Sequence, residues 1–360
     1  MRIAHIAPFA PARCGLYESA RDFVRADCLA GGDAWFVDRG IAINSESEPP
    51  VADPVDDRGG WLLPVRGRES LVQADVIVEH MSPPPEWDMP AETPIVWIQH
   101  GRPAATFRPE QADPARSHYS RLIEVANFPQ VKAVVTMWPE HMPYWAPILP
   151  REKLFQLPAP PICGDKFSAD GEAQDFGDLA GKQNVVIATA WRDDIDIFDI
   201  FHAAICYARD NPDAAKFHFY SMNLDADNGI PPVWVKLLNA LNQYGALGHR
   251  IARHGDMAQV YRAADLILSP HRICTRVVGE ALLCGTPVVA ALGNDYANWT
   301  YPIDDPEEGG RTLAQALQHI ADPTDSLEIH DDVAAQAARF SLDVSGIAMA
   351  GIYKLATTGD

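Results

Sequence analysis

The sequence predicts two doubly wound α/β domains joined by a connecting segment. Three observations lead to this fold class. Short apolar runs alternate with helix-length segments in both halves of the chain, which is typical of parallel sheets covered by helices. A proline- and glycine-rich stretch, residues 143–181, separates the two halves. A length of 360 residues suits two domains of ordinary size, each able to bury a core of its own.

In the first half, each expected strand is followed by a longer segment. Residues 2–8 form the first apolar run, and Leu16, Ala20, Phe23 and Val24 then recur at helical spacing. The other expected strands cover residues 34–37, 76–79, 95–99 and 133–136. Because the runs are short, apolar and widely spaced, they favour a parallel sheet over a sandwich.

The second half repeats this alternation and ends in a helical pattern at residues 344–355. Proline fixes φ and removes a backbone donor, so the segment 143–181, with its six prolines, is interpreted as an interdomain connection. The expected domains cover residues 1–165 and 182–342, followed by a C-terminal helix at 343–360. The expected strands of the second domain cover residues 184–189, 216–220, 250–253, 266–269 and 287–291.

Charge and cysteine usage limit the class of protein. The chain has 29 basic and 49 acidic side chains, a net charge of −20, which disfavours nucleic acid and anionic membrane surfaces as partners. No apolar run approaches the ~20 residues of a membrane span. The six cysteines have no C-x-x-C spacing, so we expect a reduced, cytoplasmic protein without a disulfide or zinc framework. Serine-hydrolase, zinc-protease and P-loop motifs are absent.

The most informative stretch is residues 263–290. An apolar run at 266–269 leads into a polar bend, a short helical segment around Glu280, and the turn Gly285-Thr286-Pro287 before the next apolar run. This order places a helix N-terminus at the end of a buried strand. The free N–H groups there favour a phosphate or diphosphate.

This stretch resembles the nucleotide-sugar site of retaining, family-4-like glycosyltransferases of the GT-B fold. Glu280 and the small-residue turn that follows it match the second half of the family motif. The first half departs, because Arg272 stands where the family has a glutamate eight positions before Glu280. A second departure follows Arg192, where the family's lysine five residues later is replaced by Ile197.

The resemblance implies roles for residues that bind the donor. Glu280 would accept hydrogen bonds from the ribose hydroxyls, and Arg276 with the backbone at Thr275 would contact the diphosphate. Arg192 would offer its planar donor fork to diphosphate oxygens. The base would be read by backbone groups near His254.

It also implies roles near the transferred sugar. His100 would donate a hydrogen bond to a sugar hydroxyl. Gly15 would let the backbone of its loop, which in the family covers the donor phosphates or borders the acceptor, approach the ligand closely. Arg272 would either replace the positive charge that Ile197 does not supply or contact the sugar itself, which would then differ from the family's or be acidic. Asp194 and Asp196 match a D-x-D metal motif, but we expect them to cap a helix, so no metal site is predicted.

The fold that the resemblance implies is GT-B: two Rossmann-like domains facing across a cleft, with the C-terminal helix packing back on the first. The implied activity is metal-independent transfer of a sugar, with retention, from a UDP- or GDP-sugar to an acceptor hydroxyl that the sequence does not identify. One alternative is a catalytically degenerate protein that only binds nucleotide or sugar. Another is transfer to a hydroxymethylated base in phage-type DNA, which the net charge of −20 disfavours.

Overall fold

The structure, a computed structural model, forms two compact units. One unit comprises Met1–Cys163 and Phe340–Asp360, and the other comprises Gly164–Arg339. The residues that the structure describes are 1–9, 15–40, 61–81, 89–100, 126–137, 142–157, 159–177, 181–188, 197–220, 232–251 and 256–358.

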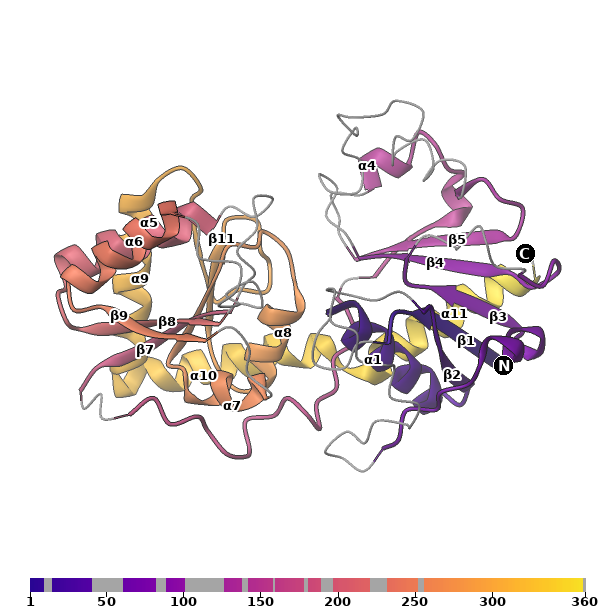
Figure 1. The fold of residues 1–360 in the computed structure, drawn as a ribbon, viewed down its shortest axis with the longest axis horizontal. Coiled ribbons are helices and arrows are strands. Elements are labelled where there is room, and N and C mark those ends of the chain that lie inside the picture. Colours follow the sequence, from indigo (N-terminus) through magenta and orange to yellow (C-terminus); the bar gives the residue numbers. More distant parts are fainter. Residues whose placement is uncertain are drawn as a thin grey trace. The chain divides into compact units, whose positions relative to one another are not determined.

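The first unit is built on a six-stranded parallel sheet in the order β2-β1-β3-β4-β5-β6 (Figure 1). The order reverses between β1 and β3, as it does in doubly wound folds. The strands are β1 (Arg2–Ala7), β2 (Asp33–Asp38), β3 (Val76–Glu79), β4 (Ile95–Gln99), β5 (Val131–Thr136) and β6 (Leu154–Gln156).

Both faces of this sheet are covered, because alternate strand residues point to opposite sides. On one face, Val78 and Ile98 pack with Phe23 of α1 (Gly15–Leu29) and Met349 of α11 (Leu342–Thr358). On the opposite face, Leu71 of η1 (Arg68–Gln73) and Trp145 of α4 (Met142–Trp145) pack in a second apolar cluster. The short helix η4 (Arg151–Lys153) directly precedes β6.

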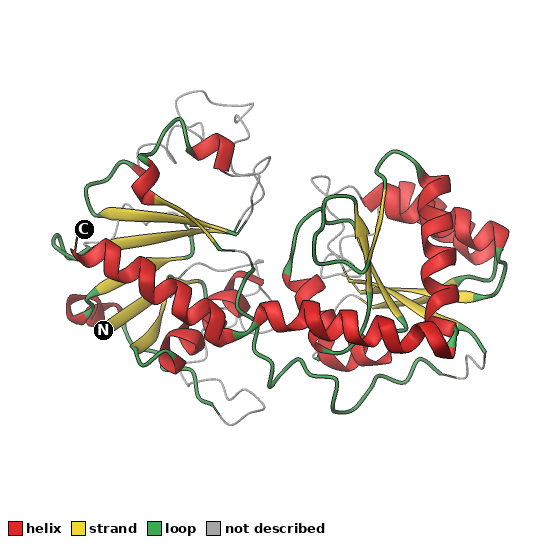
Figure 2. Cartoon of the chain, turned by 180° about the vertical axis from the view of Figure 1, so that it is seen from behind, coloured by secondary structure: helices red, strands yellow, loops and turns green. Residues whose placement is uncertain are grey.

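The C-terminal helix α11 returns to the first unit and lies against α1 (Figure 2). Gly346 allows the close approach, since a Cβ there would lie 2.6 Å from the backbone oxygen of Ala26. Gly351, on the same helix, is exposed and has no atom within 4 Å of such a Cβ.

The second unit contains another six-stranded parallel sheet, in the order β12-β11-β10-β7-β8-β9. Its order reverses between β10 and β7. The strands are β7 (Gln183–Ala188), β8 (Ala215–Tyr220), β9 (Leu247–Ile251), β10 (Leu266–Ser269), β11 (Val288–Ala291) and β12 (Trp299–Tyr301). The helices are α5 (Ile197–Asp210), α6 (Pro232–Gln243), α7 (Met257–Ala263), α8 (Arg276–Leu283), α9 (Pro306–Ala321) and α10 (Pro323–Ala337). The short helix η5 (Ala338–Phe340) crosses the boundary between the two units.

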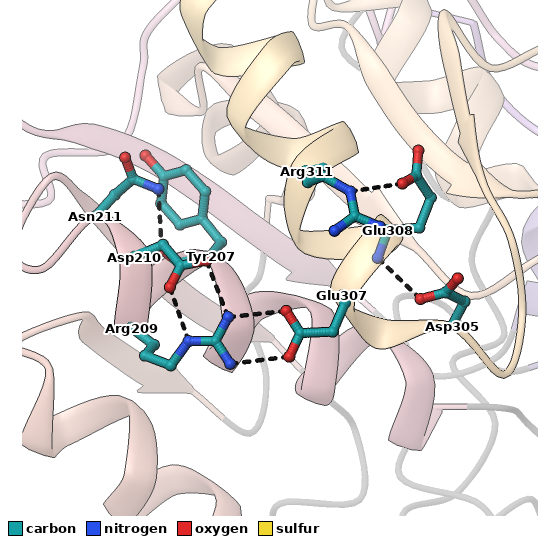
Figure 3. Close-up of polar contacts among 8 residues, drawn as sticks. All are labelled: Tyr207, Arg209, Asp210, Asn211, Asp305, Glu307, Glu308 and Arg311. Atoms are coloured by element: carbon teal, nitrogen blue, oxygen red, sulfur yellow. Dashed lines mark hydrogen bonds and ion pairs between the residues drawn. The ribbon is translucent and has the colours of Figure 1, made fainter.

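Helices α5 and α9 make a close pair on one face of this sheet. A Cβ on Gly309 would lie 2.7 Å from the Cβ of Ala203, so the helices meet almost backbone to backbone. At the exposed rim, the Arg209 guanidinium donates to both carboxylate oxygens of Glu307, at 2.9 and 2.8 Å (Figure 3). Exposed pairs of this kind contribute little stability, so close apolar packing holds the helices together.

The predicted fold class is confirmed: the chain forms two doubly wound parallel sheets, with the C-terminal helix packed on the first. Two sequence interpretations are wrong in detail. The proline-rich connection does not begin at residue 143, because α4 and β6 belong to the first unit and Trp145 is fully buried there. The short strand β12 was not expected. No helix in the described ranges combines the length and apolar character that crossing a bilayer requires.

The two glycines of α11 predict opposite effects of one substitution. Gly346→Ala should lower the free energy of unfolding by about 1–3 kcal/mol, because the added methyl group meets backbone that cannot move aside. Gly351→Ala, the matched control, should raise it by up to about 1 kcal/mol, because alanine favours the helix and meets nothing. Chemical denaturation of both variants checks this. Equal effects would mean that α11 does not pack against α1 at Gly346.

Candidate functional site

The order of the second sheet identifies one place for a ligand. Strands β7 and β10 are neighbours, but the chain continues from them toward opposite edges of the sheet. In open parallel sheets, ligands bind at such a switch point, beyond the carboxyl ends of the strands. The polar bend of residues 270–275 and the start of α8 follow β10 at this place.

The start of α8 leaves backbone donors available. Thr275 is the N-cap residue with an extended backbone, but its side chain makes no capping hydrogen bond. Within the described part of the chain, its Oγ1 is a buried oxygen without a hydrogen-bond partner. Because the cap does not satisfy the first-turn N–H groups, this helix end suits an anion.

The bend before α8 is held by a residue that the sequence analysis missed. The side-chain amide of Asn294 is 2% exposed and donates to the carbonyl oxygens of His271 and Ile273, at 2.9 and 2.8 Å. The hydroxyl oxygen of Ser269 accepts a further bond from the His271 amide at 3.3 Å. These contacts fix the backbone that leads into the helix.

Glu280 lies one turn into α8 and is buried, with 9% of the residue exposed. Its Oε1 accepts from Arg276 Nε at 3.0 Å and its Oε2 accepts from the Tyr261 hydroxyl at 3.4 Å. Burial first, and the charge of Glu280 second, hold the pKa of Tyr261 well above its usual value, so that hydroxyl donates. Each carboxylate oxygen can accept more than one hydrogen bond, so the fixed carboxylate can also receive a hydroxyl.

The predicted turn after α8 closes the helix in a Schellman arrangement. Gly285 has φ of +80°, and Thr286 N–H donates to the Ala281 oxygen while Gly285 N–H donates to Leu282. The Thr286 hydroxyl donates to the backbone carbonyl oxygen of Tyr261 at 2.6 Å. The glycine is required here because its backbone is left-handed.

The structure therefore brings Thr275, Arg276 and Glu280 together at one helix start. Arg272 is exposed in the preceding bend. Arg192 and His254 lie outside the described residues, as do Asp194 and Asp196. The predictions for these four residues stay predictions.

In the first unit, the predicted residues Gly15 and His100 lie where strands of the first sheet end. Gly15 is the first residue of α1, and no atom lies within 4 Å of a Cβ placed there. His100 follows β4, and its Nε2 lies 2.8 Å from Nδ1 of His80, a residue that the sequence analysis did not single out.

A buried ion pair at the same edge was also missed. Arg39 follows β2 and contacts Glu79, the last residue of β3, at 3.2 Å between Nη1 and Oε2. Glu79 is fully buried, and burial raises its pKa well above the usual value against the opposing charge of Arg39. Arg39 lies two residues beyond the expected strand 34–37, and Glu79 is the last residue of the expected strand 76–79. Their pairing can be predicted only once the strand order is known.

Comparison with known proteins supports the fold. No family model matches the sequence, and no curated protein matches it. A glycosyltransferase from Rickettsia africae has a similar structure, with 11% identity, TM-score 0.66, and coverage of 100% of this chain and 99% of that one. Sucrose-phosphate synthase from Thermosynechococcus elongatus is similar with 14% identity, TM-score 0.63 and full coverage of both chains. The Anabaena protein HepE, solved with UDP-glucose, is similar with 13% identity, TM-score 0.64, and coverage of 98% and 99%.

The contacts of Glu280 generate a binding prediction. Glu280→Gln should weaken UDP binding by about 1–3 kcal/mol, the contribution of a hydrogen bond to a charged group. Glu308→Gln is the control, because Glu308 also pairs with an arginine on its own helix but is exposed. Calorimetry and thermal unfolding should be measured together. A loss of stability with unchanged UDP affinity would reduce Glu280 to a support for Arg276.

Proposed function

We propose that this chain is a glycosyltransferase that moves a sugar from a nucleoside-diphosphate sugar to an acceptor hydroxyl. The observation that carries the proposal is the start of α8 at the switch point, with uncapped N–H groups and the buried Glu280 one turn away. The similar structures support the same class, since one is a glycosyltransferase, one is a sucrose-phosphate synthase and one was solved with UDP-glucose.

In this proposal the donor diphosphate binds at the helix start, through backbone N–H groups after Thr275 and through Arg276. Glu280 accepts hydrogen bonds from the ribose hydroxyls. Arg192 and Arg272 add positive charge, with Arg272 taking the place of the lysine that Ile197 replaces. Backbone near His254 reads the base, and UDP or GDP are the expected nucleotides.

Transfer breaks the bond between the anomeric carbon and the β-phosphate oxygen and forms one to the acceptor oxygen. The departing phosphate gains negative charge, which fixed cations and the helix N-terminus stabilise. That phosphate takes the acceptor proton, so the products are a glycoside and a nucleoside diphosphate, with configuration retained. No metal is needed in this scheme, because the protein supplies the positive charge.

The first unit would receive the acceptor, with His100 beside the transferred sugar and the Gly15 loop over the donor phosphates or beside the acceptor. The acceptor itself is not assigned. A reduced cytoplasmic setting belongs to the proposal. The cysteines that the structure describes form no disulfide with one another: Cys28, Cys163, Cys206, Cys274 and Cys284.

Donor hydrolysis tests the proposal directly. UDP- and GDP-sugars incubated with the protein should release nucleoside diphosphate, and EDTA should leave the rate unchanged. Thermal shifts with UDP and GDP should be measured on the same sample. The release assay should be repeated with sugar and other hydroxyl acceptors, including hydroxymethylated DNA. A thermal shift without release of nucleoside diphosphate under all these conditions would favour a degenerate protein that only binds the nucleotide. Activity abolished by EDTA and restored by Mn²⁺ would favour a metal site at Asp194 and Asp196.

A further inference from the structure

Three histidines form a continuous hydrogen-bonded chain inside the first unit. His5 Nδ1 lies 3.0 Å from His80 Nε2, and His80 Nδ1 lies 2.8 Å from His100 Nε2. The rings are stacked, with centroids 5.3 and 5.1 Å apart. His5 and His80 are 0% and 2% exposed. This histidine chain therefore leads from the core to His100, the proposed sugar-binding residue.

Strand alternation explains how the chain forms. On β1, His5 shares a face with Ile3 and Ala7, which pack under α1 and α11. His80 continues the alternation of Val76 and Val78 just beyond β3. His100 does the same after Val96 and Ile98 of β4. Since β1, β3 and β4 are neighbours in the sheet, the three rings meet side by side.

The inner end of the chain is a buried carboxylate. Asp27 of α1 has a 1% exposed side chain, and its Oδ2 lies 2.8 Å from His5 Nε2. The Tyr353 hydroxyl, from α11, donates to the same oxygen at 2.7 Å. Burial, reinforced by the charge of Asp27, raises the pKa of Tyr353 well above its usual value, so this hydroxyl keeps its proton and donates.

A carboxylate at one end sets the direction of every bond. Because Asp27 accepts, His5 carries a proton on Nε2. In the neutral form of His5, which has one donor and one acceptor nitrogen, Nδ1 then accepts. A neutral imidazole has one donor and one acceptor nitrogen, so His80 must donate from Nε2 and accept at Nδ1. Burial first, and then the two neighbouring histidines, keep the pKa of His80 well below its usual value, so this ring is neutral.

We infer that Asp27, His5 and His80 are positioning residues that fix the tautomer of His100, with the proton on Nε2 and an acceptor at Nδ1. Resting on the proposed function, this means that His100 accepts a hydrogen bond from a sugar hydroxyl. His100 therefore accepts the hydrogen bond, whereas the sequence predicted that it would donate one. The Asp27 carboxylate sets this direction through the rings of His5 and His80.

Imidazole nitrogen NMR tests the inference without donor or turnover, so its outcome is independent of the glycosyltransferase test. In the full-length protein labelled with ¹⁵N-histidine, His100→Gln identifies the His100 signals. The expected spectrum of the unsubstituted protein shows His100 with protonated Nε2 and unprotonated Nδ1 across neutral pH. A His100 protonated at Nδ1 would overturn the inference.

His5→Phe keeps a buried ring but cuts the chain, so His100 should become a mixture of both tautomers. Asp33→Asn is the control, because this exposed carboxylate of the same unit pairs with Arg66 and does not belong to the histidine chain. The control should leave the His100 signals unchanged. An unchanged tautomer in folded His5→Phe would also contradict the inference, and if that variant does not fold, the spectrum of the unsubstituted protein decides.

Discussion

All strands in each sheet run in the same direction, and this constraint decides where polar chemistry can gather. The carboxyl ends of parallel strands share one edge, and a reversal of strand order opens that edge to a ligand. In the first unit the reversal falls between β1 and β3, beside Glu79, His80 and His100. In the second it falls between β7 and β10, where α8 begins.

The polar side chains of the histidine chain are buried, and the hydrogen bonds that link them offset the cost of removing them from water. Asp27 is the centre of this network, because it accepts from the first strand through His5 and from the last helix through Tyr353. The Asp27 carboxylate therefore connects the first strand and the last helix of the polypeptide to the ring of His100. It both holds these two elements together and orients the proposed sugar-binding residue.

The sequence was sufficient for the alternating strands and for the helix carrying Glu280, because apolar periodicity and a Gly-Thr-Pro turn are local signals. The prolines around β6 predicted an interdomain connection instead of a strand. The prediction was wrong because β6 is an edge strand, which tolerates prolines on both sides. The histidine chain could not be found locally, because His5 and His80 are 75 residues apart and only strand order unites them. Asn294 was missed for the same reason, as its carbonyl partners precede it by 21 and 23 residues.

In the proposed function, the start of α8 binds the diphosphate of a nucleotide. Amide hydrogen exchange of the protein, measured with and without UDP, reports on this contact. We expect the backbone amides from Arg276 to Glu280 to exchange more slowly when UDP is bound, with α9 and α10 unchanged. Binding of UDP with no protection in this turn would show that the diphosphate does not bind at the start of α8.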